Sequence, residues 1–176
     1  MKTNIALIGF MGTGKSAVGR ALAAKLGREF VEMDSLIEEM AGKTIPEIFQ
    51  QDGEIAFREM EIEVTRKVAQ NTRQVIACGG GMVLNKINID RLKETSRMVY
   101  LKASLGKILE RTSNGNSERP LLDVPDPEQR IKELLDFRKP FYERSADITI
   151  NTTRLSIDKV VELIINRLKE DESFNF

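Results

Sequence analysis

One stretch constrains the fold of this chain more than any other: residues 9–16, with the sequence GFMGTGKS. It matches G-x-x-x-x-G-K-[ST], the pattern of a loop that binds phosphate groups. The apolar run 5–8 before it has the length of a strand, and residues 15–26 after it carry apolar side chains at helical spacing. We therefore predict a strand, a phosphate-binding loop and a helix, in that order.

The residue types of this loop suit nucleotide phosphates. Backbone N–H groups at Gly12, Thr13 and Gly14 can surround phosphate oxygens, and the positive end of the following helix adds to the attraction. Lys15 would reach the β- and γ-phosphates, and the Ser16 hydroxyl would bind Mg²⁺. The alternative is a glycine-rich turn that binds nothing. We favour phosphate binding because strand, loop, Lys-Ser pair and helix all occur in order.

Composition limits the chemistry that the rest of the chain can supply. We expect one domain over residues 1–176, and the 27 acidic and 27 basic residues balance, which gives no argument for a nucleic-acid or membrane partner. No apolar run approaches the roughly 20 residues of a membrane span. A single cysteine, Cys78, suits a reducing cytoplasm. The chain has no histidine, so a general base must be a carboxylate, a lysine or bound water.

Strand-like and helical segments alternate along the chain, which predicts an α/β fold with a parallel sheet covered by helices on both faces, in three αβα layers. The strand-like runs are 5–8, 29–33, 74–78, 98–101 and 147–150. The helical segments are 15–26, 34–41, 45–70, 87–94, 104–112, 127–145 and 157–169. The sequence Thr44-Ile45-Pro46-Glu47 is typical of a capping box at a helix start.

Two carboxylates, Glu32 and Asp34, stand at the end of the second predicted strand, where ligands of an open α/β sheet bind. Because they are two residues apart on a strand, both can face the phosphate loop. One could hold a water bound to Mg²⁺ while the other takes a proton from a substrate hydroxyl. Alternatively, Asp34 is a helix N-cap and Glu32 a solvated strand end. Spacing alone leaves both interpretations open.

Three further features indicate a site for a small anion. The glycine run 79–81 follows a strand and permits close approach of an anion to the backbone, although a flexible hinge would also use glycines. Arg138 shares the inward face of its helix, where a charge must be paired or line a cavity. Arg58 and Glu61 lie one helical turn apart, which is also the spacing of an ordinary exposed ion pair.

The segment 112–127 breaks the pattern, because turn-forming residues dominate it and Arg119 stands in its middle. We expect a surface loop there. A loop of this length in a compact domain is more often a lid or binding element than an idle connection, so we predict a lid over about 112–125. Arg111 ends the preceding helix, where a cation is also favourable for the helix itself.

Together these features suggest a nucleoside triphosphate that meets a small anionic molecule bearing a hydroxyl. Phosphoryl transfer needs mostly positioning and charge neutralisation, which a lysine, Mg²⁺ and a lid arginine supply without histidine. A GTPase-type switch is disfavoured because N-K-x-D is incomplete at 85–88 and D-x-x-G does not occur. A non-catalytic nucleotide-binding module would leave Asp34 and the arginines without a task.

The ordered motifs resemble those of the shikimate kinases, from the first strand to the last helix. They are GFMGTGKS at 9–16, an acid-x-Asp pair at 32–34, Phe57-Arg58-x-x-Glu61, the glycines at 79–81, RPLL at 119–122 and Arg138-x-Pro140-x-Tyr142. The phosphate loop alone occurs in many unrelated enzymes, whereas the ordered set is far more specific.

That resemblance implies a P-loop kinase fold with a lid and a five-stranded parallel sheet of order 2-3-1-4-5. It implies a monomer that uses Mg²⁺ to transfer the γ-phosphate of ATP to the 3-hydroxyl of shikimate, with a substrate-binding region at about 33–61. The implied catalytic residues are Lys15, Asp34 and Arg119. The implied ATP contacts are Gly12, Thr13, Gly14, Lys15, Ser16, Ala17, Arg111, Arg119 and Arg154, with Arg111 stacked on adenine. The implied shikimate contacts are Asp34, Arg58, Glu61, Gly79, Gly80, Gly81 and Arg138, and the metal ligands are Ser16 and Glu32.

Two positions depart from the family's pattern. Glu32 stands where aspartate is usual and is one methylene longer, and Ala17 stands where a hydroxyl residue is usual, which removes a possible α-phosphate contact. Neither change removes a required catalytic group. The gluconate kinases share the loop and the sheet and are the alternative family, but they are expected to lack the set formed by Arg58, the glycine run and Arg138.

Overall fold

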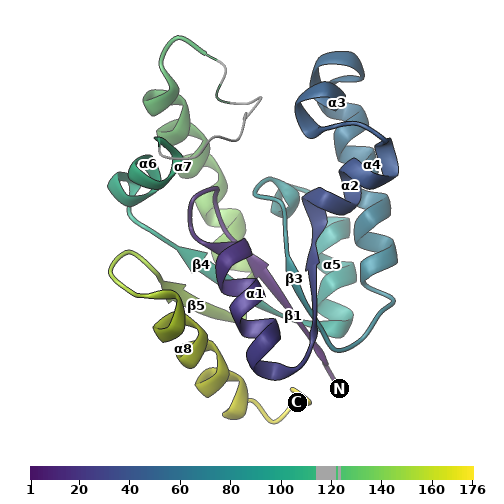
Figure 1. Ribbon diagram of the computed structural model, residues 1–176, viewed down its shortest axis with the longest axis vertical. Helices are drawn as coiled ribbons and strands as arrows, with labels where there is room; N and C mark the ends of the chain where they lie inside the picture. Colours follow the sequence, from purple (N-terminus) through teal and green to yellow (C-terminus); the bar gives the residue numbers. More distant parts are fainter. Residues whose placement is uncertain (114–121, 123) are drawn as a thin grey trace.

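The structure is a computed structural model of the chain, and it describes residues 1–113, 122 and 124–176 (Figure 1). The strands are β1 (Asn4–Ile8), β2 (Glu29–Glu32), β3 (Gln74–Ala77), β4 (Ser96–Lys102) and β5 (Ile148–Asn151). The helices are α1 (Lys15–Leu26), α2 (Met33–Ala41), α3 (Ile45–Gln51), α4 (Gly53–Val68), α5 (Lys86–Thr95), α6 (Leu105–Ser113), α7 (Pro127–Ser145) and α8 (Ile157–Lys169), with a 3-10 helix η1 at Met82–Leu84. The predicted alternation of strands and helices is confirmed.

The strands form one parallel sheet in the order β2-β3-β1-β4-β5, as the family resemblance implied. The first strand is central, so that Ile5 pairs with Val75 on one side and with Arg97 on the other. In a parallel sheet the carboxyl ends of all strands lie at one edge, and ligands bind there. The phosphate loop therefore leaves the middle of the sheet at the edge where a site is expected.

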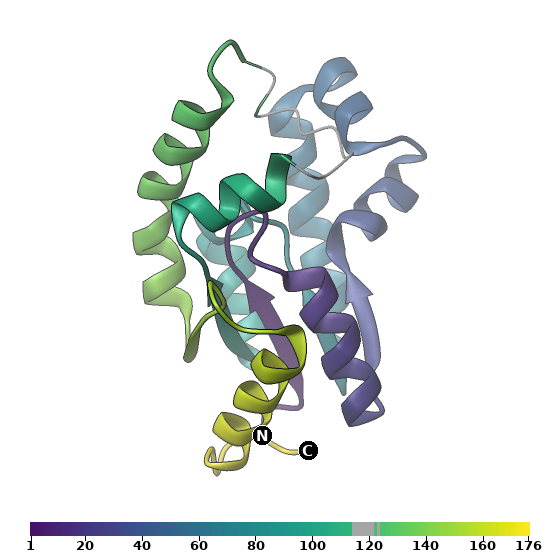
Figure 2. The ribbon, with the colours of Figure 1, turned by 60° about the vertical axis from the view of Figure 1, so that its left-hand side comes forward.

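Side chains of β1 alternate between two hydrophobic cores. Ile5 and Leu7 belong to a core shared with residues of α1 and α8, whereas Ala6 and Ile8 belong to a core shared with residues of α4, α5 and α7. These two groups of helices lie on opposite faces of the sheet (Figures 1 and 2). All four side chains are fully buried. Full burial of an Ile or Leu side chain stabilises a fold by about 1.5–3 kcal/mol. The strand that carries the phosphate loop is thus anchored from both faces, and the three-layer prediction is confirmed.

The predicted helical segment 45–70 forms two helices, α3 and α4. They divide at Gly53, which has φ 84°, a conformation that residues with a Cβ rarely adopt. The predicted capping box is confirmed, since the Thr44 N–H donates to Glu47 Oε2 at 2.7 Å and the Thr44 hydroxyl accepts from the Glu47 N–H. The break lets α3 pack beside α4 at the carboxyl edge of the sheet (Figure 1).

In the part of the chain that the structure describes, no helix has both the length and the apolarity needed to cross a bilayer.

Candidate active site

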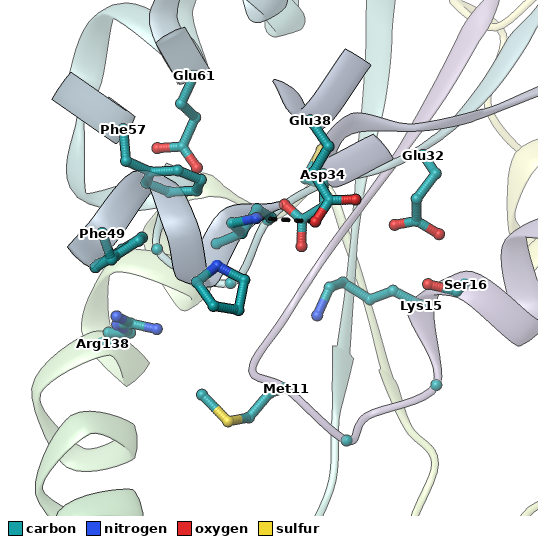
Figure 3. Close-up of a pocket in the computed structure, with 18 of the residues that line it drawn as sticks. Met11, Lys15, Ser16, Glu32, Asp34, Glu38, Phe49, Phe57, Glu61 and Arg138 are labelled. Atoms are coloured by element: carbon teal, nitrogen blue, oxygen red, sulfur yellow. Dashed lines mark hydrogen bonds between the residues drawn. The ribbon is translucent and has the colours of Figure 1, made fainter. Parts of the chain in front are cut away.

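A cavity of about 660 Å³ lies at the carboxyl edge of the sheet (Figure 3). Its walls are the phosphate loop, the starts of α1 and α2, helices α3 and α4, the glycine run 79–81, and one arginine each from α6 and α7. The predicted site residues that it brings together are Gly12, Gly14, Lys15, Ser16, Ala17, Glu32, Asp34, Arg58, Glu61, Gly79, Gly80, Gly81, Arg111 and Arg138.

Two of the described residues of the predicted site are not in this lining. Thr13 is buried within the phosphate loop. Arg154 lies at a separate cavity of about 530 Å³, which it shares with Ser104 and Asn151. Arg119 lies outside the described residues, as does most of the predicted lid.

Side chains of the phosphate loop are hydrogen-bonded to backbone carbonyls of the same loop. Lys15 Nζ donates to the carbonyl oxygens of Gly9 and Phe10 at 2.7 and 2.9 Å, and the Thr13 hydroxyl donates to the Phe10 carbonyl at 2.8 Å. Helix α1 begins at Lys15, directly after Gly14, so the positive end of the helix and the lysine charge stand at the same place. This arrangement attracts a polyphosphate.

Oxygen ligands for a magnesium ion stand beside the loop. The Ser16 hydroxyl lies near the Glu32 carboxylate, and both residues line the cavity (Figure 3). Burial raises the pKa of Glu32, and the nearby Ser16 hydroxyl partly offsets that rise. Mg²⁺ prefers oxygen ligands and usually keeps several waters beside one or two protein groups and substrate phosphates. The Ser16–Glu32 pair therefore fits this ion.

Asp34 lies in the first turn of α2, not on the strand with Glu32, because β2 ends at Glu32 and the helix begins at Met33. The prediction that both carboxylates project from one strand is wrong. The N-cap alternative is also wrong, since Glu32 is the N-cap and makes no capping hydrogen bond with its side chain. Both carboxylates nevertheless reach the cavity. Burial raises the pKa of Asp34, and the positive charge of Lys15 partly offsets the rise.

Arg58 and Glu61 form a pair that is largely withdrawn from solvent. Arg58 Nη1 donates to Glu61 Oε1 at 3.1 Å, and Glu61 is only 1% exposed. Arg58 Nη2 also donates to Glu54 Oε1 at 3.2 Å. Burial raises the pKa of Glu61, and the charge of Arg58 opposes that effect. The pair is therefore not the ordinary exposed pair that its spacing allowed, and Glu61 holds Arg58 at the cavity wall.

Arg138 faces inward, as its helical spacing predicted. The residue is 3% exposed and lines the cavity from α7. Its guanidinium carbon lies 5.7 Å from the centre of the Phe10 ring. Among the described residues, Arg138 Nε has no hydrogen-bond partner. A buried and incompletely bonded guanidinium on a cavity wall is well suited to bind an anion.

The glycine run 79–81 is closely surrounded by charged side chains. A Cβ atom added at Gly79 would lie 3.0 Å from Glu61 Oε2 and 3.1 Å from Asp34 Oδ1. A Cβ atom at Gly80 would lie 3.5 Å from Arg138 Nη1, and one at Gly81 would lie 2.5 Å from Arg58 Nη2. The charged groups of the cavity thus occupy the space that larger residues would need. Close approach, rather than hinge flexibility, accounts for these glycines.

The cavity also has an apolar wall and a further acid that the sequence motifs did not single out. Phe49 and Phe57 pack with ring centres 4.9 Å apart on the wall formed by α3 and α4. Glu38 Oε1 accepts a hydrogen bond from the Ile45 N–H at 2.9 Å, which ties α2 to the start of α3. The family resemblance implied a substrate-binding region at about 33–61 that includes α3, but no local sequence pattern singles out Phe49 or Glu38.

Arg111 and Thr152 connect the phosphate loop to the end of β5. Arg111 Nη1 donates to the Gly12 carbonyl at 3.0 Å, and Nη2 donates to the Thr152 carbonyl at 3.4 Å. The Thr152 hydroxyl donates to the Thr13 carbonyl at 3.2 Å. Arg111 therefore does more than favour a helix C-terminus, because it bonds to the loop that would carry the phosphates.

The phosphate loop, the strand order and the adjoining cavity place this fold among the P-loop kinases, and solved structures of such enzymes superpose on it. A gluconokinase from Sinorhizobium meliloti aligns with a TM-score of 0.59 over 96% of this chain and 94% of its own, but 18% identity shows the fold alone. Shikimate kinase from Acinetobacter baumannii, solved in complex with shikimate, aligns with a TM-score of 0.93 and 38% identity over 98% of this chain and 96% of its own.

Sequence comparisons narrow this class to a family. The family model described as shikimate kinase matches residues 11–169. Shikimate kinase from Thermodesulfovibrio yellowstonii is 49% identical over 92% of this chain and 92% of its own length. The enzyme of the same name from Pelotomaculum thermopropionicum is 47% identical over 95% of this chain and 96% of its own length. The chain belongs to the shikimate kinase family, as its ordered motifs indicated, and the gluconate kinase alternative is set aside.

Proposed function

We propose that this protein transfers the γ-phosphate of ATP to the 3-hydroxyl of shikimate, giving shikimate 3-phosphate and ADP. One observation carries the proposal: Lys15, Asp34 and Arg138 line a single cavity from three different elements (Figure 3). The lysine and the adjoining helix start suit a polyphosphate. The buried arginine suits a carboxylate. An aspartate with a raised pKa suits a hydroxyl that must lose its proton.

The acid is bound through its carboxylate and its ring. Arg58, Arg138 and the backbone of the glycine run 79–81 would hold the carboxylate, with Glu61 orienting Arg58 through its 3.1 Å hydrogen bond. The aromatic wall of α3 and α4 offers an apolar surface to the carbocycle. Asp34 would bind the ring hydroxyls on the side that faces Lys15. These contacts orient the acceptor before any bond changes, which is the main requirement of phosphoryl transfer.

In the proposed reaction the 3-hydroxyl oxygen bonds to the γ-phosphorus, and the bond from that phosphorus to the β–γ bridging oxygen breaks. The proton of the hydroxyl passes to the Asp34 carboxylate. Burial raises the pKa of Asp34, which makes its carboxylate a better proton acceptor than an exposed one. Lys15 would exchange its bonds to the Gly9 and Phe10 carbonyls for phosphate oxygens and offset their charge.

The remaining roles concern the nucleotide and the metal. Loop residues 12–17 would surround the phosphates, and Ser16 would bind Mg²⁺, with Glu32 holding one of its waters. When bound, the ion neutralises charge on the β- and γ-phosphates. Arg111 and Arg154 would contact the adenine. Arg119, which lies outside the described residues, would approach the transferred phosphate from the lid.

An assay of ADP release with several acceptors tests this proposal. Shikimate, quinate, gluconate and nucleoside monophosphates are offered separately with ATP and Mg²⁺, and ATP alone measures background hydrolysis. We expect shikimate to give the highest kcat/KM, because it presents a carboxylate, a flat ring and a hydroxyl together. A higher kcat/KM with gluconate or a nucleoside monophosphate would show that the proposal is wrong.

A further inference from the structure

Tyr142 lies behind the wall of the cavity, on α7, four residues after Arg138. It is fully buried, and its ring stacks on Tyr100 with centres 5.1 Å apart and an angle of 20° between the planes. The Tyr142 hydroxyl donates a hydrogen bond to the Gly80 carbonyl at 2.5 Å. The residue is absent from the lining of the cavity, so its side chain acts on the site only through the groups that it contacts.

The second group near the Tyr142 hydroxyl is Arg138. Residues four apart on a helix share a face, and the Arg138 guanidinium lies against Gly80, with Nη1 3.5 Å from the position that a Cβ atom would take there. Burial raises the pKa of Tyr142 well above its ordinary value, and Arg138 partly offsets this rise. The phenol is therefore neutral at physiological pH, with one proton to donate and lone pairs to accept. It can donate to Gly80 and accept from Arg138 at the same time.

The Tyr142 hydroxyl thus adjoins two parts of the anion site, the Gly80 carbonyl to which it is bonded and the Arg138 guanidinium nearby. The peptide group between Gly80 and Gly81 is planar, so a held Gly80 carbonyl also fixes the direction of the Gly81 N–H. Gly80, Gly81 and Arg138 all line the cavity. A single buried hydroxyl can thus set the angle between a backbone donor and a guanidinium that border the same space.

We propose that Tyr142 is a positioning residue for the acceptor: its hydroxyl aligns the Arg138 guanidinium and the Gly80–Gly81 peptide so that both converge on the substrate carboxylate. The inference rests on the proposed function, because it takes the acceptor to be an acid held by Arg138. Tyr142 does not touch the acid and takes no part in the proton transfer. Its removal therefore weakens acceptor binding and leaves the nucleotide half of the reaction unchanged.

The first test compares Tyr142→Phe with Tyr100→Phe. Both variants remove one hydroxyl from the same stacked pair, but only the first loses the bond to Gly80. Loss of one buried hydrogen bond corresponds to about a tenfold change in an equilibrium constant. We expect Tyr142→Phe to raise the KM for shikimate about tenfold while kcat and the KM for ATP stay near wild type. Tyr100→Phe is expected to keep all three constants.

The second measurement does not depend on whether Tyr142→Phe folds. The chain has no tryptophan and two tyrosines, so Tyr142 is the only source of tyrosine absorption in Tyr100→Phe. Shikimate should draw Arg138 toward its carboxylate and change the near-ultraviolet absorption of the Tyr142 phenol, whereas ATP alone should not. Calorimetry on the same sample confirms that shikimate is bound.

Failure of this inference is distinct from failure of the proposed function. If wild type does not phosphorylate shikimate, the proposed function is wrong. If wild type does so but Tyr142→Phe keeps the wild-type KM for shikimate, the positioning role is wrong. The role is equally excluded if bound shikimate leaves the absorption of Tyr142 in Tyr100→Phe unchanged.

Discussion

The two halves of the cavity satisfy their polar groups in different ways. In the half that faces the phosphate loop, the nucleotide half, backbone carbonyls of the loop accept hydrogen bonds from Lys15, Arg111 and Thr152. In the half formed by α2, α4 and α7, the acceptor half, charged side chains face one another. Glu61 Oε2 and Arg138 Nε have no hydrogen-bond partner in the part of the chain that the structure describes.

This difference indicates in which half of the cavity a ligand must supply the missing hydrogen-bond partners. Buried charges that are only partly paired cost free energy of folding, and the raised pKa values of Asp34 and Glu61 are the sign of that cost. Backbone carbonyls bonded to a lysine or an arginine carry a smaller cost. We infer that the buried charges in the acceptor half gain their remaining hydrogen-bond partners from the bound acid.

The largest expected effect comes from Asp34→Asn, which removes the proposed base and keeps its shape. We expect kcat to fall by about 10²–10⁴-fold, the usual contribution of a general base, while ATP binds with little change. Steady-state ADP release measures kcat, and calorimetry measures ATP binding. Glu38→Gln is the matched control, since it neutralises another acid of α2 that lines the cavity but keeps an oxygen for the Ile45 N–H.

The pH dependence of kcat/KM for shikimate, measured for wild type and for Glu38→Gln, tests this assignment of the base further. A base must be deprotonated, so kcat/KM for shikimate should be lost as the pH falls through the pKa of Asp34. Because burial raises that pKa, the loss should begin above the range in which exposed aspartates titrate. The Glu38→Gln profile should keep this acidic limb. A wild-type kcat in Asp34→Asn would remove the base assignment.

Arg138→Ala should have the next largest effect. Removal of one partner from a buried charged interaction typically costs several kcal/mol, so the KM for shikimate should rise on the order of a hundredfold. The KM for ATP should hardly change. The control is Lys139→Ala, the next residue on α7, whose side chain is exposed and pairs with Glu143 at 3.9 Å. A defect limited to the KM for ATP would place Arg138 in the nucleotide half instead.

The smallest effect is expected in the nucleotide half, from Thr152→Val. This change keeps the shape of the side chain but removes the hydroxyl that bonds to the Thr13 and Lys102 carbonyls. A neutral hydrogen bond contributes about 0.5–1.5 kcal/mol, so the KM for ATP should rise roughly threefold to tenfold. The KM for shikimate should stay constant, as should both constants in Thr149→Val on the exposed face of β5. Equal rises in both KM values would contradict the division into halves.

The phosphate loop was predictable from sequence because its groups are contiguous, whereas Thr152, which bonds to the loop from the end of β5, was not predicted. Eight consecutive residues contain the loop, the lysine and the start of α1, so local pattern and structure coincide. The inward position of Arg138 was also predictable, since it follows from helical spacing with the apolar residues of α7. The strand order came from the family resemblance, because periodicity alone does not state which strands are neighbours.

The acceptor half was harder to predict because it is assembled from distant segments. The break at Gly53 depends on how α3 packs, and a glycine within a helical pattern costs only about 1 kcal/mol. The misplacement of Asp34 arose from an element boundary, since β2 ends at Glu32 and α2 begins at Met33, directly before it. Phe49 and Glu38 gave no sequence pattern of their own, and Arg119 lies outside the described residues.

The crowding at positions 79–81 has a practical consequence for anyone who wishes to change which acid is accepted. A methyl group at Gly81 would displace the Arg58 guanidinium, and one at Gly79 would press on two carboxylates. Redesign of acceptor preference is therefore better started from α3 and α4, where Phe49 and Phe57 offer side chains that can be exchanged for smaller or more polar ones.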